Sequence, residues 1–148
     1  MEKKKGHQDF STNDHENSYN NLFSALGAVI MALDTRDIVS SGHSLQVMEL
    51  ACAVGKKMAL PGRELEDLRL TALLHDVGKI GINEIILCKP GRFTDQEYSV
   101  VKRHSKIGEK ILAEVEHLKP IASFVRHCHE RFDGKGYPDG IGGWGVRY

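Results

Sequence analysis

The residues that point most directly to chemistry are His75, Asp76 and Lys79, in the run His-Asp-Val-Gly-Lys that follows the nearly apolar segment 70–74. A charged side chain at the end of a buried helix needs a partner or a metal ion. Successive helical residues point about 100° apart, so His75 and Asp76 can both reach one ion or two neighbouring ions. Lys79 follows on the same side and can direct its charge at whatever the ion holds. The alternative is a buried His-Asp pair without a metal.

Further residues of ligand type stand where predicted helices begin or end. His43 opens one helix, His104 ends another, and Cys128 and His129 close a third. A mixed shell of nitrogen and oxygen ligands, with a carboxylate able to bridge, suits a centre of two Fe, Mn or Zn ions. A single histidine is more often a surface or core residue, as expected for His117. Taken together, the helix ends favour a metal centre.

The elements that must position these side chains are all predicted to be helices. Apolar residues recur at helical spacing, and Thr94 to Glu97 form a capping-box pattern. No alternating strand pattern and no repeat occurs, so the predicted fold class is all-α, a compact multi-helix domain. Residues 1–18 are polar without periodicity and are expected to be a flexible segment before a domain at 19–148. The predicted helices lie at about 22–33, 40–58, 63–77, 94–104, 107–118 and 120–130.

The composition excludes several classes of protein. The chain has 148 residues, the size of one domain, with 20 basic and 20 acidic residues. This balance argues against a nucleic-acid polymer as partner, whereas a small anionic substrate fits if a metal supplies positive charge. The three separated cysteines indicate a reducing, cytoplasmic setting rather than a disulfide framework. The sequence contains no apolar run of about 18 residues, so no membrane span is predicted.

Five segments share their order and spacing with one known family. They are GHS (42–44), HDVGKIGI (75–82), KPGRFT (89–94), His104 with the Lys-Ile-Gly that follows, and HERFDGKGYPDG (129–140). Over roughly residues 20–143 the chain therefore resembles the HD-GYP family, whose members hydrolyse the bacterial messenger cyclic di-GMP. The resemblance implies an HD-domain fold and two divalent ions, Fe or Mn with Zn as the alternative. The implied ligands are His43, His75, Asp76, His104 and His129.

The resemblance also implies roles in catalysis and in partner binding. Asp76 would bridge the ions and Lys79 would contact the substrate phosphate. The loop that carries Gly136, Tyr137 and Pro138 is implied to contact diguanylate cyclase (GGDEF) domains. The alternative for this segment is a loop whose glycines allow positive φ and whose proline stiffens it, without any substrate contact.

The sequence departs from the family pattern near two of its ligand positions. Cys128 stands where the family usually has histidine. As a thiolate it would be a softer ligand and would favour Zn or Fe, whereas as a thiol it would only fill apolar space. Both readings stay open, and His127 is a possible substitute. Val39 stands where three-metal members have glutamate, which implies two ions at most.

The third departure is at the C-terminal end. The family continues into further helices, with another aspartate ligand and basic residues for the substrate, whereas this sequence ends at Tyr148. We therefore expect the chain alone to bind metal weakly and to hydrolyse cyclic di-GMP slowly or not at all. We also expect an uncovered apolar patch near Leu73, Phe124 and Val125, which a homodimer would hide.

The sequence thus predicts a metal-dependent phosphodiesterase acting on cyclic di-GMP. An HD-type hydrolase of another nucleotide is one alternative, although the GYP segment argues against it. The other is a regulatory or binding module that keeps the fold without turnover. Metal content separates these classes, because a module of this kind would purify without a transition metal.

Overall fold

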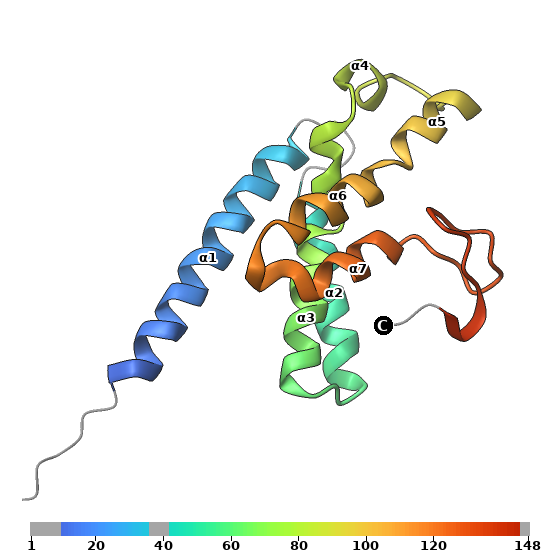
Figure 1. Ribbon diagram of the computed structural model, residues 1–148. Helices are drawn as coiled ribbons and strands as arrows, with labels where there is room; N and C mark the ends of the chain where they lie inside the picture. Colours follow the sequence, from blue (N-terminus) through green and yellow to red (C-terminus); the bar gives the residue numbers. More distant parts are fainter. Residues whose placement is uncertain (1–9, 36–41, 146–148) are drawn as a thin grey trace, which may run out of the picture.

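The computed structural model describes residues 10–35 and 42–145, and within these ranges it contains helices and loops but no strand (Figure 1). The predicted all-α fold class is therefore confirmed. The α-helices of the described residues are α1 (Phe10–Asp34), α2 (His43–Lys57), α3 (Gly62–Leu74), α4 (Glu84–Leu87), α5 (Asp95–Val101), α6 (His104–Ala113) and α7 (Lys119–His127). Short 3₁₀ turns are η1 (Val77–Gly81), η2 (Glu116–Leu118) and η3 (Gly143–Gly145).

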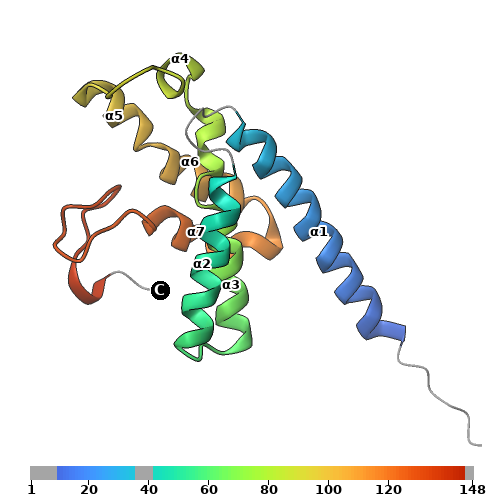
Figure 2. The ribbon, with the colours of Figure 1, turned by 180° about the vertical axis from the view of Figure 1, so that it is seen from behind.

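The core lies where α3, α6 and α7 meet. Leu73 and Leu74 of α3, Leu112 of α6, and Ile121 and Val125 of α7 are buried together there. Figures 1 and 2 show α2 and α3 side by side, with α6 and α7 crossing them and α1 standing to one side. The arrangement brings the end of α3 against the start of α6 and the end of α7, which is where the chemistry-bearing residues lie.

The crossing of η1 over α6 depends on glycine. A Cβ atom at Gly78 would overlap the carbonyl oxygen of His104 and the amide nitrogen of Gly108. Only a residue without a side chain allows the two backbones to come this close. The predicted third helix, to residue 77, ends at Leu74 instead, because the chain tightens into η1 to make this crossing.

The N-terminal helix begins earlier than the sequence predicted. Residues 1–18 were expected to be a flexible segment, whereas residues 10–18 belong to α1; residues 1–9 lie outside the described part, and the domain boundary at residue 19 stays a prediction. Figure 1 shows the first half of α1 running out from the rest of the molecule. Adding residues to an existing helix costs little, so a polar segment continues the helix without an apolar stripe.

Two further expectations about surface and boundaries are wrong. Leu73 and Val125 are both 0 % exposed because α3 and α7 pack on each other, so they form no uncovered patch, and Phe124 is half-buried. His104 does not end a helix but begins α6. The predicted capping box is confirmed, with Thr94 and Glu97 at the start of α5. In the described ranges no helix has the length and hydropathy to cross a membrane.

Candidate metal centre

The candidate ligands come from four separate parts of the chain. His43 is the first residue of α2, and His104 is the first residue of α6. His75 and Asp76 occupy the junction between α3 and η1, and His129 lies in the turn after α7. Placing ligands at element ends lets side chains from different directions meet at one point.

Two clusters of potential ligand atoms form, and Asp76 belongs to both. One contains His43, His75 and Asp76, and the other contains Asp76, His104 and His129, with ligand atoms within 4.8 Å of one another in each. Asp76 Oδ2 lies 3.3 Å from His75 Nε2. Its other oxygen, Oδ1, lies 3.3 Å from His104 Nε2. The carboxylate therefore faces one cluster with each oxygen, as a bridging ligand between two ions would.

The spacing of the donor atoms fits a metal ion. His104 Nε2 and His129 Nε2 are 3.0 Å apart. Two ligands on one tetrahedral ion, with bonds of about 2.0–2.1 Å, are separated by roughly 3.3 Å. The donor types, imidazole nitrogen and carboxylate oxygen, suit Fe, Mn or Zn. The residues present thus fit the two-ion centre that the motifs predict, and their role as ligands stays a prediction.

Backbone carbonyls orient two of the imidazoles. Nδ1 of His75 lies 2.8 Å from the carbonyl oxygen of Ala72, and Nδ1 of His104 lies 2.8 Å from that of Val101. Since a carbonyl oxygen only accepts, each Nδ1 donates this bond, and the neutral form of each imidazole keeps its lone pair on Nε2, the atom that faces Asp76. Ligand histidines commonly have such a partner on the nitrogen that does not bind metal.

The protonation states of the second cluster favour a cation. Burial lowers the pKa of His129 to about 4, with a further contribution from nearby His104. Burial also lowers the pKa of His104. Burial opposes ionisation of Asp76, but the hydrogen bond and charge of His75 and the ammonium of Lys79 outweigh it and hold the Asp76 pKa well below its usual value. Near neutral pH the cluster therefore offers neutral imidazoles and a carboxylate, the forms that bind metals.

In the first cluster, the one with His43 and His75, the pKa of His75 shifts in the opposite direction. Burial acts to lower the pKa of His75, but the hydrogen bond and charge of Asp76 outweigh it, and the pKa is raised. Lys79 Nζ lies 2.8 Å from Asp76 Oδ2, on the side of this cluster. Lys79 is thus placed beside the carboxylate predicted to bridge the ions, within reach of an anion bound there.

His43 is exposed, and its position is set by the residue next to it. Ser44 donates from its amide to Asp34 Oδ2 at 3.1 Å and from its hydroxyl to Asp34 Oδ1 at 2.9 Å. Both Asp34 and Ser44 are buried. The carboxylate at the end of α1 thereby anchors the start of α2, and the His43 ring comes to lie 5.5 Å from that of His75. Sequence analysis did not single out Asp34, since nothing in its neighbourhood marks it. Val39 lies outside the described residues.

Cys128 and His127 are not brought into either cluster of the described residues. Although Cys128 as a whole is exposed, its thiol donates to the Val125 carbonyl at 3.2 Å. Burial of the sulfur, together with the charge of Asp76, raises the Cys128 pKa to about 12. His127 Nε2 lies 3.0 Å from the Asp139 carboxylate instead. The ligand role of Cys128 stays untested, and the geometry favours the packing alternative.

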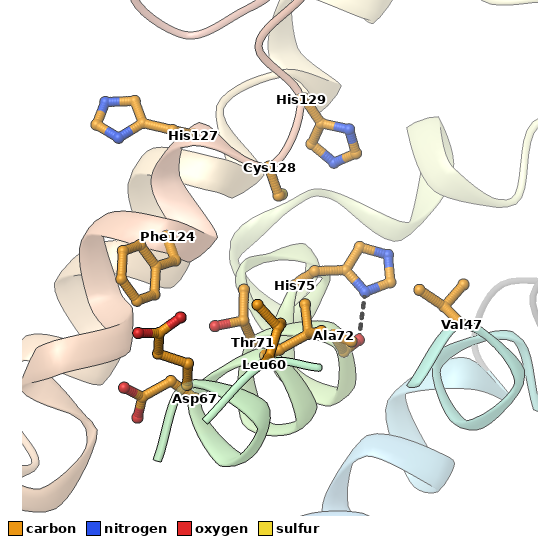
Figure 3. A pocket seen from close by; sticks show the side chains of 12 residues that line it. Val47, Leu60, Asp67, Thr71, Ala72, His75, Phe124, His127, Cys128 and His129 are labelled. Carbon is orange, nitrogen blue, oxygen red and sulfur yellow. Dashed lines mark hydrogen bonds between the residues drawn. The ribbon is translucent and has the colours of Figure 1, made fainter. Parts of the chain in front are cut away.

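A cavity of about 520 Å³ adjoins the centre between α2, α3 and α7. Figure 3 shows His75 and His129 at one side of it, Phe124 at another, and the His127 ring turned away from both. Its walls are mostly apolar, with Asp67 and Thr71 among the polar exceptions. The Thr71 hydroxyl is buried and has no hydrogen-bond partner among the residues that the structure describes. A ligand reaching the histidines from this side would meet an apolar wall.

The loop 130–143 folds back against the centre. Glu130 Oε1 accepts from the amides of Asp139 (2.7 Å) and Gly140 (3.0 Å). The Asp139 carboxylate also accepts two bonds from Arg126, at 2.7 and 2.8 Å, and Arg126 additionally pairs with Glu109. Sequence analysis treated this loop as a partner surface and did not foresee that it would be anchored on α7.

The fold and the site define an all-α domain with a histidine–aspartate centre, and comparisons with known proteins agree. The sequence model of the HD domain family matches residues 27–144. A cyclic di-GMP phosphodiesterase of Pseudomonas aeruginosa is 36% identical over 113 residues, which are 76% of this chain and 27% of the relative. The cyclic di-GMP phosphodiesterase response regulator RpfG of Xanthomonas campestris is 35% identical over 120 residues, 80% of this chain and 32% of the relative.

A third relative is named for a related substrate. The 3′3′-cGAMP-specific phosphodiesterase 3 of Vibrio cholerae is 33% identical over 122 residues, 82% of this chain and 26% of the relative. The chain spans about a quarter to a third of the length of the curated relatives it matches. On this evidence the chain belongs to the HD domain family and, within it, to the HD-GYP type.

Proposed function

We propose that this chain is the hydrolytic domain of a metal-dependent phosphodiesterase that acts on cyclic di-GMP. The observation that carries the proposal is the position of Asp76, with each carboxylate oxygen 3.3 Å from a different histidine nitrogen. The names of the relatives from Pseudomonas and Xanthomonas support the substrate. The predicted catalytic roles of Asp76 and Lys79 and the ligand roles of the histidines are part of this proposal.

In this proposal, different residues have different roles in phosphodiester hydrolysis. Divalent ions at such a centre polarise phosphoryl oxygens and lower the pKa of water. Asp76 and the imidazoles supply the negative charge and lone pairs that hold such ions. Lys79, beside Asp76, would neutralise charge that develops on the phosphate, and an ammonium near an anion suits this role. The neutral state of His129 keeps the site from repelling cations at neutral pH.

A cyclic dinucleotide with one adenine, 3′3′-cGAMP, is the second candidate substrate, because a relative of similar identity is named for it. Both molecules present the same phosphodiester bonds to the centre, so the metal residues cannot distinguish them. Their bases differ, and parallel rate measurements on the two substrates decide between them.

The remaining parts of the proposal concern the identity of the ions, the partner proteins and the location in the cell. The ions are Fe or Mn, with Zn as the alternative, since imidazole and carboxylate ligands suit all three. The loop with Gly136, Tyr137 and Pro138 is the surface for a diguanylate cyclase (GGDEF) domain, and a homodimer is a second assembly. A cytoplasmic location is proposed because the substrate is an intracellular messenger and the three cysteines are widely separated in the sequence, without the spacing of a disulfide framework.

The test is product formation by the purified chain supplied anaerobically with Fe²⁺ or Mn²⁺. We expect linear dinucleotide or GMP to accumulate only slowly, as predicted for this chain alone, and Asp76→Asn to lower the rate by roughly a further 100-fold or more, because ligand loss exceeds the 10–100-fold typical of outer residues. His117→Ala, at an exposed position on η2, is the matched histidine control. Hydrolysis that survives Asp76→Asn would contradict the proposal. Nucleotide binding without turnover, by a chain that holds no transition metal, would favour the regulatory module.

A further inference from the structure

His129 differs from the two other buried ligand candidates in how its ring is held. His75 and His104 each have Nδ1 bonded to a carbonyl oxygen three residues earlier in their own segment. His129 lies beyond the end of α7, and within the described residues its Nδ1 makes no such bond. Some other contact must therefore fix the orientation of this imidazole if it is to share an ion with Asp76.

Tyr137 makes that contact. Its ring is stacked on the His129 imidazole, with centroids 4.8 Å apart and planes inclined by 18°. It also meets His104 edge-on, at 6.1 Å and 76°. These separations lie in the range of favourable aromatic pairs, which contribute about 0.5–1.5 kcal/mol beyond area burial. One face of His129 is thereby covered while its Nε2 stays directed at His104 Nε2, 3.0 Å away.

The backbone around Tyr137 is held independently of the metal ligands' side chains. The amide of Tyr137 donates to the carbonyl of His129 at 3.2 Å. A Cβ atom at Gly136 would overlap the backbone of Glu130 and Arg131, so glycine is required for the loop to lie this close. Farther along, the Asp139 amide donates to the Glu130 carboxylate, and Arg126 donates two bonds to the Asp139 carboxylate. These bonds fix the other side of the loop.

On its outer side, Tyr137 is in contact with α5. Tyr98 meets the Tyr137 ring edge-on at 6.3 Å and 82°, and Tyr98 is itself 46% exposed. The Lys102 ammonium lies 6.0 Å from the centre of the Tyr137 ring. Tyr137 is therefore enclosed between a surface helix and the second metal cluster, which limits its own freedom to turn.

We propose that Tyr137 is a positioning residue of the metal centre: its aromatic ring, stacked on His129, holds that imidazole in the orientation in which it shares an ion with Asp76 and His104. The inference rests on the metal centre proposed above and adds to it a role for the loop that is distinct from partner binding. The ring carries the effect, since the stacked contact involves its face and not the hydroxyl.

The first measurement is the affinity of the full chain for Mn²⁺ and Zn²⁺, by calorimetric titration of metal-free protein. We expect Tyr137→Leu to weaken binding roughly 10- to 100-fold, the loss usual for residues that orient a ligand. Tyr137→Phe keeps the stacked ring and should bind within about twofold of the wild type. Phe132→Ala removes a 75% exposed aromatic side chain from the same loop and is the matched control.

A second measurement needs no metal. In metal-free protein with labelled histidine, a stacked ring shifts the Cδ2 proton of His129 upfield in the nuclear magnetic resonance spectrum. This shift should be present in the wild type and in Tyr137→Phe and lost in Tyr137→Leu. This pattern tests whether the two rings stack in solution, and its absence in the wild type would overturn the proposal.

Melting temperatures of the metal-free variants separate positioning from folding. Tyr137→Met, whose flexible side chain fills similar space, is the second variant in case Tyr137→Leu unfolds. Loss of the fold in both would overturn the proposal, because it would show a structural role. Unchanged affinity in Tyr137→Leu, or equal losses in Tyr137→Leu and Tyr137→Phe, would also overturn it while leaving the metal centre intact. A wild-type chain that binds neither ion would instead refute the centre itself.

Discussion

At the scale of single residues, the shared carboxylate of Asp76 makes a prediction about metal stoichiometry. His43 belongs to one cluster and His129 to the other, whereas Asp76 belongs to both. We therefore expect His43→Ala and His129→Ala each to lower the bound metal from two ions per chain to one, and Asp76→Ala to remove both. Elemental analysis after equilibrium dialysis against excess Mn²⁺ measures this, with His117→Ala as control. Loss of both ions in His43→Ala would show that the clusters are not independent sites.

The thiol of Cys128 makes a second prediction at this scale. A pKa raised to about 12 means that the thiol is protonated at neutral pH, and that its thiolate fraction stays small until the pH approaches that value. In a chain with Cys52→Ser and Cys88→Ser, iodoacetamide should modify Cys128 at pH 8 roughly tenfold or more slowly than it modifies glutathione, since greater nucleophilicity offsets only part of the lost thiolate.

The same chain tests whether Cys128 binds metal. A bound ion deprotonates a thiol ligand and shields the resulting thiolate. A ligand role for Cys128 therefore predicts a change in alkylation rate when Zn²⁺ is added. We expect equal rates with and without Zn²⁺, and unchanged metal stoichiometry in Cys128→Ala. Protection by Zn²⁺ would restore the ligand role that the sequence left open.

The residues that could be predicted from sequence are those with local signatures. His75 and Asp76 stand side by side after an apolar helix, and His104 and His129 were found through the order and spacing of motifs. Asp34 and the stacking of Tyr137 could not be found in this way. Asp34 bonds to Ser44 ten positions away, and Tyr137 reaches His104 across 33 positions. Such contacts depend on how helices cross, which periodicity does not specify.

At the scale of elements, the crossing of η1 over α6 makes a prediction about Gly78. Gly78→Ala would force apart two backbones, because the added Cβ has no flexible neighbour to displace. We expect destabilisation of roughly 1–3 kcal/mol, as for other overpacked sites, together with weaker metal binding because Asp76 and His104 flank the crossing. Urea denaturation measures the first effect and metal titration the second. Gly62→Ala, where nothing lies within 4 Å of the added atom, is the control.

The elements also show how far local sequence signals extend. The capping box at Thr94 was predictable because both of its bonds are made within four residues. The end of α3 was predicted at residue 77 because residues 70–74 continue the apolar helical pattern. The helix ends earlier because the chain forms the 3₁₀ turn η1, which contacts α6, and a local pattern does not indicate such a tertiary contact. The early start of α1 was missed because the prediction relied on apolar residues, and a helix can extend beyond the part of it that packs.

At the scale of the whole molecule, the proposed ions join segments that lie far apart in the sequence. The ligands come from the start of α2, the end of α3, the start of α6 and the turn after α7. Bound metal should therefore stabilise the packing of these helices rather than the helices themselves. A chelator should leave the far-ultraviolet circular dichroism at room temperature nearly unchanged while it lowers the melting temperature.

The size of that shift follows from mass action. A ligand at 100 times its Kd stabilises the folded state by about 2.7 kcal/mol, provided that it does not bind the unfolded chain. For a domain of 148 residues this corresponds to a rise in Tm of roughly 5–10 °C for one site. Asp76→Ala should show no such rise at the same Mn²⁺ concentration, and His117→Ala should show all of it. If the wild-type melting temperature were the same with Mn²⁺ and with chelator, the ions would not join these helices, and the convergence of histidines on Asp76 would need another explanation.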